Sequence, residues 1–211
     1  MGAMKVEDLI QRISDKGVIL IYGEGGVGKT TLTAQILSAK AKQGLQVAYL
    51  YSSELSLARF KAVFEEASSQ PSMIIKITDL QLQDRSIEAL YRARGGGLGA
   101  VAIDTLTDAY RSYVASKRSP IQASKLLNQQ LAMLATLAEE EGLTVIVTSR
   151  ARRLAEDLEP EASSLLEYWA HVSLRLERLG KPGYRRIIIE KGPAKLRGEA
   201  IEALITKGGF R

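Results

Sequence analysis

The sequence predicts an α/β fold in which a mainly parallel, twisted sheet is flanked by helices and carries antiparallel strands at its carboxy-terminal edge. Two patterns indicate it. Over residues 17–148, short apolar runs rich in β-branched side chains alternate with stretches of helical periodicity, as in repeated strand–helix–strand units. After residue 168 the helical periodicity stops, and the remaining apolar runs are separated by turns that contain glycine and proline.

The elements of the parallel part follow one another closely. The first apolar run, 17–22, leads into a glycine-rich turn and then into a helical pattern that begins at Lys29 and ends at Gly44, which supplies a left-handed residue. We expect further strands at 47–51, 73–77, 100–104 and 143–148, and further helices at 57–67, 87–94 and about 121–141. We expect the closing antiparallel strands at 170–176, 184–189 and 199–205.

The composition is that of an ordinary globular domain, since 45% of the 211 residues are hydrophobic and 25% are charged. We expect residues 4–211 to form a single domain, with residues 1–3 as an expression scar ahead of a natural start at Met4. No apolar run approaches the roughly 20 residues that span a bilayer, so we expect a cytoplasmic protein. The chain has no cysteine, which excludes disulfides, thiolate zinc sites and cysteine nucleophiles, and its single histidine, His171, argues against a histidine-based metal site.

The chain carries a modest excess of positive charge. Its 29 lysines and arginines exceed its 24 aspartates and glutamates, which gives a net charge of +5. This excess is typical of proteins that bind a polyanion such as DNA or RNA, but a solvated basic surface explains it equally well. Charge alone therefore leaves the partner open.

A phosphate-binding motif lies between the first predicted strand and the first predicted helix. The segment Gly23-Glu24-Gly25-Gly26-Val27-Gly28-Lys29-Thr30 fits the pattern G-x-x-x-x-G-K-[ST]. Glycines let successive backbone N–H groups curl around phosphate oxygens, and the N-terminus of the following helix adds partial positive charge. Lys29 would reach the terminal phosphates of a nucleotide, and the Thr30 hydroxyl would ligate Mg²⁺. A purely structural glycine turn is the alternative interpretation.

Two acidic residues near strand ends are candidates for the chemistry at this loop. Asp104 ends an apolar run and is placed to hold a magnesium-bound water; alternatively, it caps the segment that begins at Thr105. Glu54 follows the second predicted strand, where a general base could activate the water that attacks the γ-phosphate. The alternative for Glu54 is an ordinary charge at a helix N-terminus. Nucleotide hydrolysis would thus use Lys29, Glu54 and Asp104 as catalytic residues.

In their order along the chain, the segments GEGGVGKTT, VAYLYSSELSLARF, AVAIDTLTDAYR and LTVIVTSR resemble the ATPase core of the RecA/RadA recombinase superfamily. The likeness extends from about residue 18 to residue 210 and includes the closing strands. Within the superfamily the chain is most similar to the short archaeal recombinase paralogues of the RadB type, which lack an N-terminal helix-hairpin-helix domain. The resemblance implies a RecA-like P-loop NTPase fold, ATP and Mg²⁺ as cofactors, and a role in DNA recombination and repair with single-stranded DNA.

The resemblance also assigns residues to the nucleotide. It implies that residues 25–31 hold the phosphates and that Thr30 and Asp104 hold Mg²⁺. It further implies that Arg59, which matches the arginine of the family's P-E-R segment, lies against the adenine. The complete predicted cofactor-binding set is Gly23, Gly25, Gly26, Val27, Gly28, Lys29, Thr30, Thr31 and Arg59.

Two positions depart from the family's pattern. Where the family usually has D-T-E after the second strand, Tyr51-Ser52-Ser53-Glu54 places the glutamate one residue late, which leaves its catalytic role open. Where recombinases have T-N-Q after the fifth core strand, with a polar residue that senses the γ-phosphate, this chain has Thr148-Ser149-Arg150. Arg150 could reach either a phosphate group or DNA.

The resemblance places two DNA-binding loops after the fourth and fifth core strands, at 112–120 and 150–160. Basic side chains in these segments could follow a nucleic-acid backbone. Both segments lack a glycine-rich stretch, and acidic residues follow the arginines, so a solvated face or a protein interface is the alternative. The candidate DNA-binding residues are Lys117, Arg118, Arg150, Arg152 and Arg153.

These observations predict an accessory recombinase paralogue that binds Mg-ATP, hydrolyses it slowly, and binds DNA, a recombinase partner or both. One alternative is a regulatory subunit that binds ATP only to stabilise a hetero-oligomer with a recombinase. Another is a hexameric ATPase similar to KaiC or DnaB, because SSEL also resembles the S-x-E pattern of those groups. The sequence leaves the oligomeric state open.

Overall fold

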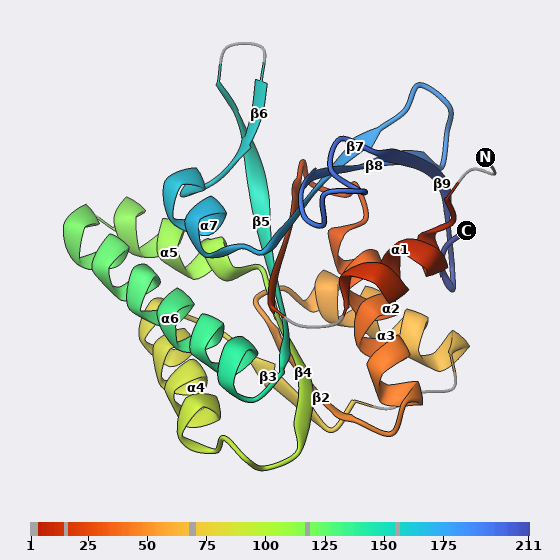
Figure 1. The fold of residues 1–211 in the computed structure, drawn as a ribbon. Coiled ribbons are helices and arrows are strands. Elements are labelled where there is room, and N and C mark those ends of the chain that lie inside the picture. Colours follow the sequence, from red (N-terminus) through yellow and green to blue (C-terminus); the bar gives the residue numbers. More distant parts are fainter. Residues whose placement is uncertain (1–3, 15–16, 68–70, 117–118, 155–156) are drawn as a thin grey trace.

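The computed structural model describes residues 4–14, 17–67, 71–116, 119–154 and 157–211. In this part of the chain a ten-stranded sheet runs through the middle of the molecule, with helices on both of its faces (Figure 1). The strands are β1 (Gly17–Gly23), β2 (Gln46–Tyr51), β3 (Met73–Lys76), β4 (Leu98–Asp104), β5 (Thr144–Leu154), β6 (Asp157–Pro160), β7 (Val172–Arg178), β8 (Tyr184–Lys191), β9 (Ala200–Thr206) and β10 (Gly209–Phe210). The strand order is β10-β9-β8-β7-β1-β5-β4-β2-β3, and β6 pairs with β5 outside this path.

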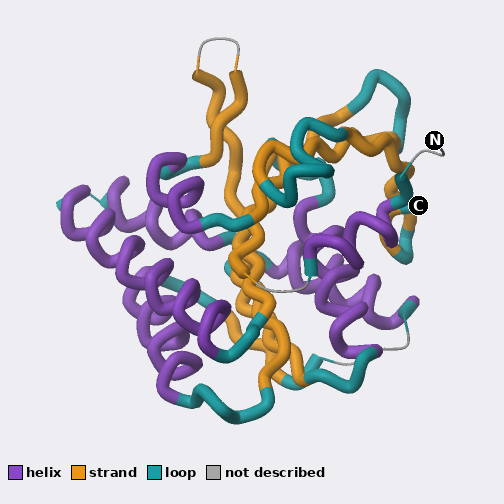
Figure 2. Tube along the Cα trace, in the orientation of Figure 1, coloured by secondary structure: helices purple, strands orange, loops and turns teal. Residues whose placement is uncertain are grey.

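The helices divide between the two faces of the sheet, as the purple coils on either side of the orange strands in Figure 2 show. They are α1 (Val6–Ile13), α2 (Lys29–Lys42), α3 (Glu54–Glu66), α4 (Leu80–Arg92), α5 (Leu106–Ala115), α6 (Pro120–Glu140) and α7 (Ser163–Trp169). One hydrophobic core lies beneath α1, α2 and α3 and includes residues of the closing strands. A second core lies beneath α4, α5, α6 and α7.

Burial on both faces of the sheet explains why the sequence of β1 is apolar throughout and does not alternate between apolar and polar residues. Every residue from Gly17 to Gly23 is buried. Successive side chains of a strand point to opposite faces. Val18 and Leu20 therefore join the core beneath α4 to α7, whereas Ile19 and Ile21 join the core beneath α1 to α3.

The predicted fold class is confirmed. Strands β3, β2, β4, β5, β1 and β7 pair in parallel, in that order. Strands β8, β9 and β10 continue the sheet in antiparallel pairing from β7. One detail differs from the expectation: β7, predicted among the antiparallel strands, pairs in parallel with β1 and antiparallel only with β8.

Several elements were not expected from the sequence. These are α1, α5, α7, β6 and β10. In addition, α4 begins at Leu80 instead of residue 87, because its first turns bury a polar side chain that interrupts the apolar pattern. The Gln83 amide donates to the carbonyl oxygen of Leu106 at 3.2 Å and to Gln130 Oε1 at 2.8 Å. Within the described residues, no helix combines the length and apolar character needed to cross a membrane.

Candidate functional site

The carboxyl ends of β1, β4 and β5 meet at one edge of the sheet, next to the N-terminus of α2. A pocket of about 430 Å³ opens at this edge. Ligands of open α/β sheets bind in the crevice beyond the carboxyl ends of the strands. The pocket is lined by Gly25, Gly26, Gly28, Lys29, Thr30 and Thr31 of the predicted phosphate loop and by residues of α3, β4, α5, β5 and β9.

The loop uses glycine where its backbone adopts a left-handed conformation. Gly26 has a φ of 74° and Gly28 a φ of 108°. The predicted residues Gly23 and Val27 do not line the pocket; they are packed against the protein interior. Val27 is 1% exposed, and a Cβ on Gly23 would lie 2.4 Å from the carbonyl oxygen of Leu176. Side chains larger than hydrogen are therefore incompatible with the path of the loop at these glycines.

Lys29 is the first residue of α2 and is 9% exposed. Its ammonium donates to the carbonyl oxygens of Gly23 and Glu24, at 2.8 and 2.9 Å, and so closes the loop on itself. Burial lowers the pKa of Lys29 below its usual 10.5, and the negative charge of Asp104 opposes this effect. The loop thus holds a buried cation next to the atoms that would surround a phosphate group.

Asp104 ends β4 and is 2% exposed. Its carboxylate accepts hydrogen bonds from three hydroxyls: Thr30 at 2.6 Å and Tyr49 at 2.7 Å on Oδ2, and Thr148 at 2.6 Å on Oδ1. Burial and the neighbouring carboxylate raise the pKa of Tyr49, so this phenol stays a proton donor. The alternative role of Asp104 as a simple cap is not supported, because its side chain faces the pocket and α2 and not the start of α5.

Thr30 and Asp104 fit the ligand preferences of Mg²⁺, which binds oxygen ligands and usually keeps phosphate oxygens and waters in its shell. The two side chains are in direct contact, with 2.6 Å between Thr30 Oγ1 and Asp104 Oδ2. Among the described residues, no group of three His, Cys, Asp or Glu side chains could form a complete metal site by itself. This edge of the sheet therefore suits a cation that arrives together with a phosphorylated ligand.

Glu54 lies outside the pocket, contrary to the position expected for a general base. It is the first residue of α3 and forms an ion pair with Lys76 at the end of β3, with 2.6 Å between Oε1 and Nζ. The side chain of Glu54 is 65% exposed. The neighbouring Ser53 and Ser56, which share a helix face, line the pocket instead. The position of Glu54 matches the alternative interpretation, a charge at a helix N-terminus.

The structure brings Asp108 into the pocket, a residue that the sequence analysis did not single out. Its carboxylate accepts a hydrogen bond from Ser52 at 3.0 Å and forms an ion pair with Arg150 at 3.1 Å. Arg111 lies 3.5 Å from the same carboxylate. Asp108 follows Asp104 by four residues in DTLTDAYR and lies in the first turn of α5, so recognising α5 in the sequence would have placed both carboxylates at the same edge.

Arg59 borders the pocket from α3, but its guanidinium is engaged by the chain itself. Nε donates to Thr31 Oγ1 at 2.8 Å, and the two terminal nitrogens donate to the carbonyl oxygens of Thr206 and Lys207, at 2.6 and 2.8 Å. Burial lowers the pKa of Arg59. Arg59 therefore ties the phosphate loop to the turn between β9 and β10, and its contact with adenine stays a prediction.

Arg150, Arg152 and Arg153, three of the candidate DNA-binding residues, lie on a β-hairpin and not on a loop, because β5 continues to Leu154 and pairs with β6. Arg150 lines the same pocket as the predicted phosphate loop and pairs with Asp108. Arg152 pairs with Glu159 across the hairpin at 3.5 Å and is 55% exposed. Lys117, Arg118 and the side chain of Arg153 lie outside the described residues.

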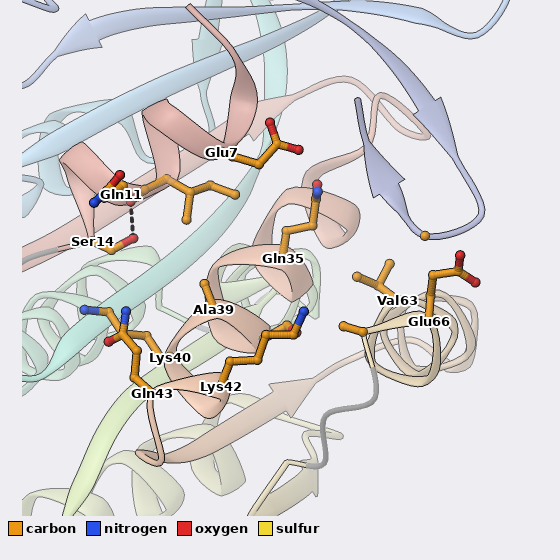
Figure 3. A pocket seen from close by; sticks show the side chains of 14 residues that line it. Glu7, Gln11, Ser14, Gln35, Ala39, Lys40, Lys42, Gln43, Val63 and Glu66 are labelled. Carbon is orange, nitrogen blue, oxygen red and sulfur yellow. Dashed lines mark hydrogen bonds between the residues drawn. The ribbon is translucent and has the colours of Figure 1, made fainter.

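A larger pocket of about 600 Å³ lies on the α1 to α3 face. Glu7 from α1, Gln35 and Lys42 from α2 and Glu66 from α3 surround it (Figure 3). None of the predicted site residues lines it. The smaller pocket is the better candidate, because it alone of the two combines the glycine loop with Lys29, Thr30 and Asp104.

Comparisons with known proteins agree with this geometry. Residues 4–156 match the family described as AAA domain. The chain is 29% identical over 192 residues to the DNA repair and recombination protein RadB of Methanocaldococcus jannaschii, covering 88% of this chain and 89% of that protein. It is 26% identical over 212 residues to the protein of the same name from Methanococcoides burtonii, covering 98% of this chain and 94% of the relative.

A third relative of the same name, from Thermococcus onnurineus, is 29% identical over 219 residues, and the alignment covers 99% of this chain and 95% of that protein. A solved structure described as the crystal structure of the RadB recombinase superposes with a TM-score of 0.77 at 24% identity, covering 99% of this chain and 96% of that one. The resemblance to the RecA/RadA ATPase core and to its RadB-type paralogues is confirmed.

Proposed function

The chain belongs to the AAA domain family, and from this premise we propose that it binds ATP with Mg²⁺ at the pocket beside β1 and hydrolyses the nucleotide slowly. The observation that carries the proposal is the contact between Thr30 and Asp104, 2.6 Å, directly beside the Lys29 ammonium within the glycine loop. A glycine turn with only a structural role would not need a buried lysine, a hydroxyl and a carboxylate to converge.

In this proposal, different residues of the pocket bind different parts of the Mg-ATP complex. Backbone N–H groups of residues 25–31 and the Lys29 ammonium bind the phosphates, and Thr30 and Asp104 hold the cation. When bound, Mg²⁺ neutralises charge on the β- and γ-phosphate oxygens. Arg150 is placed to approach the γ-phosphate, because it lines the same pocket. Its ion pair with Asp108 fixes the guanidinium in that region.

Slow hydrolysis follows from the carboxylates that face the pocket. Among the described residues these are Asp104 and Asp108. Asp104 already accepts three hydroxyl hydrogen bonds, and Asp108 is paired with Arg150 and Arg111. A general base needs a free lone pair within reach of the attacking water. Glu54, the predicted base, pairs with Lys76 instead, so ATP binding is expected to dominate over turnover.

The named relatives support a role in DNA recombination and repair for this protein, as an accessory to a recombinase. We propose single-stranded DNA as its nucleic-acid ligand and a recombinase as its protein partner, with residues 4–211 acting as one ATPase domain in the cytoplasm. The net charge of +5 and the exposed Arg152 on the β5–β6 hairpin support the DNA contact.

Steady-state ATP hydrolysis, measured with and without single-stranded DNA and beside a Lys29→Ala control, tests this function. We expect a low rate that depends on Lys29 and Mg²⁺, together with DNA binding. Turnover comparable to that of a full recombinase would contradict the proposed slow hydrolysis.

A regulatory subunit that binds ATP without turning it over is the second candidate, favoured by the paired state of Asp104 and Asp108. A rate that stays at background with DNA, alongside tight binding to a recombinase, would identify it. The third candidate is a hexameric ATPase similar to KaiC or DnaB, suggested by the SSEL segment; a closed ring in solution would identify it.

A further inference from the structure

The closing strands pack closely against the phosphate loop. A Cβ on Gly28 would lie 2.5 Å from the ring of Phe210 in β10, and one on Gly23 would lie 2.4 Å from the backbone of β7. Two arginines continue this contact along the loop. Neither Arg178 nor Arg185 lines the pocket, so both approach the loop from outside.

Arg178 and Arg185 hold consecutive carbonyl groups of the loop. Arg178, the last residue of β7, donates to the carbonyl oxygen of Gly25 at 2.7 Å. Arg185, the second residue of β8, donates to the carbonyl oxygen of Gly26 at 3.5 Å. The two arginines are direct partners in the antiparallel register of β7 and β8.

Like charges directly opposite each other on neighbouring strands are destabilising. Burial and the charge of Arg178 both lower the pKa of Arg185, and its Nε is buried without a hydrogen-bond partner among the described residues. The pairing of these two cations therefore needs compensation. The loop carbonyls supply part of it, and an anion held in the loop would supply more.

Peptide geometry links these carbonyls to phosphate binding. In a planar trans peptide the C=O and the following N–H point in opposite directions. With the carbonyls of Gly25 and Gly26 held outward, the N–H groups of Gly26 and Val27 point toward the pocket. Glycine peptides reorient easily because no Cβ restricts them, so the loop needs such an external restraint to keep its N–H groups convergent.

We propose that Arg178 and Arg185 are positioning residues that lock the Gly25 and Gly26 peptides in the orientation that binds phosphate. The part of this inference that concerns ATP rests on the proposed function. The β7–β8 hairpin, which is far from the loop in sequence, would then contribute to the affinity for the nucleotide. Arg186 is the matched control, since it is adjacent to Arg185 but pairs with Glu202 at 2.8 Å.

The test compares Arg178→Gln, Arg185→Gln and Arg186→Gln with the unmodified protein. Without nucleotide, we expect faster hydrogen–deuterium exchange of the loop 23–28 in the first two variants, at unchanged melting temperature. With fluorescent ATP, we expect their Kd to rise about tenfold, the loss typical of a charge-assisted hydrogen bond. Arg178→Lys should restore part of the affinity, and Arg186→Gln should behave as the unmodified protein in both measurements.

Unchanged exchange and unchanged Kd in Arg178→Gln and Arg185→Gln would overturn the inference while leaving ATP binding intact. A lower melting temperature at unchanged Kd would also overturn it, because the arginines would then only support the fold. ATP binding that is missing from the unmodified protein would instead overturn the proposed function, and loop exchange would then decide the positioning role by itself.

Discussion

Asp104 shows at the residue scale how a buried charge becomes compatible with the sheet. A buried carboxylate is costly unless hydrogen bonds replace its water. Hydroxyls from α2, β2 and β5 converge on Asp104 and supply these bonds. The same convergence keeps its Oδ2 next to Thr30, where a cation and a phosphate group would meet it.

Tyr49→Phe should weaken this arrangement without changing its packing, because the phenyl ring keeps its stack on Phe60 at 3.7 Å between centroids. We expect a loss of about 1.5–3 kcal/mol in the free energy of unfolding, typical of a hydrogen bond to a charged group. Urea unfolding measures it. Tyr51→Phe, whose hydroxyl makes no hydrogen bond among the described side chains, is the control. Equal stability losses in the two variants would contradict the role of the Tyr49 hydroxyl.

The lowered pKa of Lys29 predicts opposite pH trends for binding and stability. As the pH rises from this lowered pKa towards 10.5, the ammonium loses its charge and ATP affinity should fall. Over the same range the unfolded state binds more protons than the folded state, so the contribution of Lys29 to folding stability becomes more favourable. Binding and unfolding measured against Lys29→Ala test this. A wild-type affinity that stays flat up to pH 10.5 would contradict it.

At the scale of elements, the β5–β6 hairpin distinguishes two arginines that the sequence places in one basic segment. Arg150 lines the proposed nucleotide pocket, whereas Arg152 does not line it and pairs with Glu159 across the hairpin. The alternation of side chains along a strand places residues 150 and 152 on the same face of β5, so their separation rests on their positions along the strand and on their different ion-pair partners.

Arg150→Ala should raise the Kd for ATP and leave DNA binding nearly unchanged. Arg152→Ala combined with Arg153→Ala should weaken DNA binding and lower the salt slope by about one unit for each phosphate group that the variant no longer neutralises. Fluorescence anisotropy with labelled single-stranded DNA at several salt concentrations measures both effects. A reversed result, with Arg150 controlling DNA and the pair controlling ATP, would contradict the assignment.

Elements with a continuous apolar signal could be predicted from the sequence, and those with buried polar groups could not. The strands of the parallel sheet follow from apolar runs, and most of α6 follows from the helical periodicity of its apolar residues. The start of α4 was missed because Gln83 and Gln130 satisfy each other inside the core, where periodicity expects apolar residues. Strand β6 was missed because its residues owe their conformation to β5 and carry no strand pattern of their own.

At the scale of the whole molecule, the site combines segments far apart in the chain. The loop and Asp104 could be predicted because each follows directly from the strand that positions it. The orientations of Glu54 and Arg59 could not be predicted, because they depend on partners that only the folded chain brings close. Glu54 pairs with Lys76, and Arg59 donates to carbonyl groups of the β9–β10 turn. The contacts that β7, β8 and β10 make with the loop likewise form only when the whole sheet is assembled.

Equilibrium binding of ATP to the purified protein, titrated with Mg²⁺ and repeated with Lys29→Ala, tests whether the pocket is a nucleotide site. We expect saturable binding that strengthens with Mg²⁺ and is lost in Lys29→Ala, while that variant keeps its folded circular dichroism spectrum. Absence of binding, or binding that survives Lys29→Ala unchanged, would contradict it.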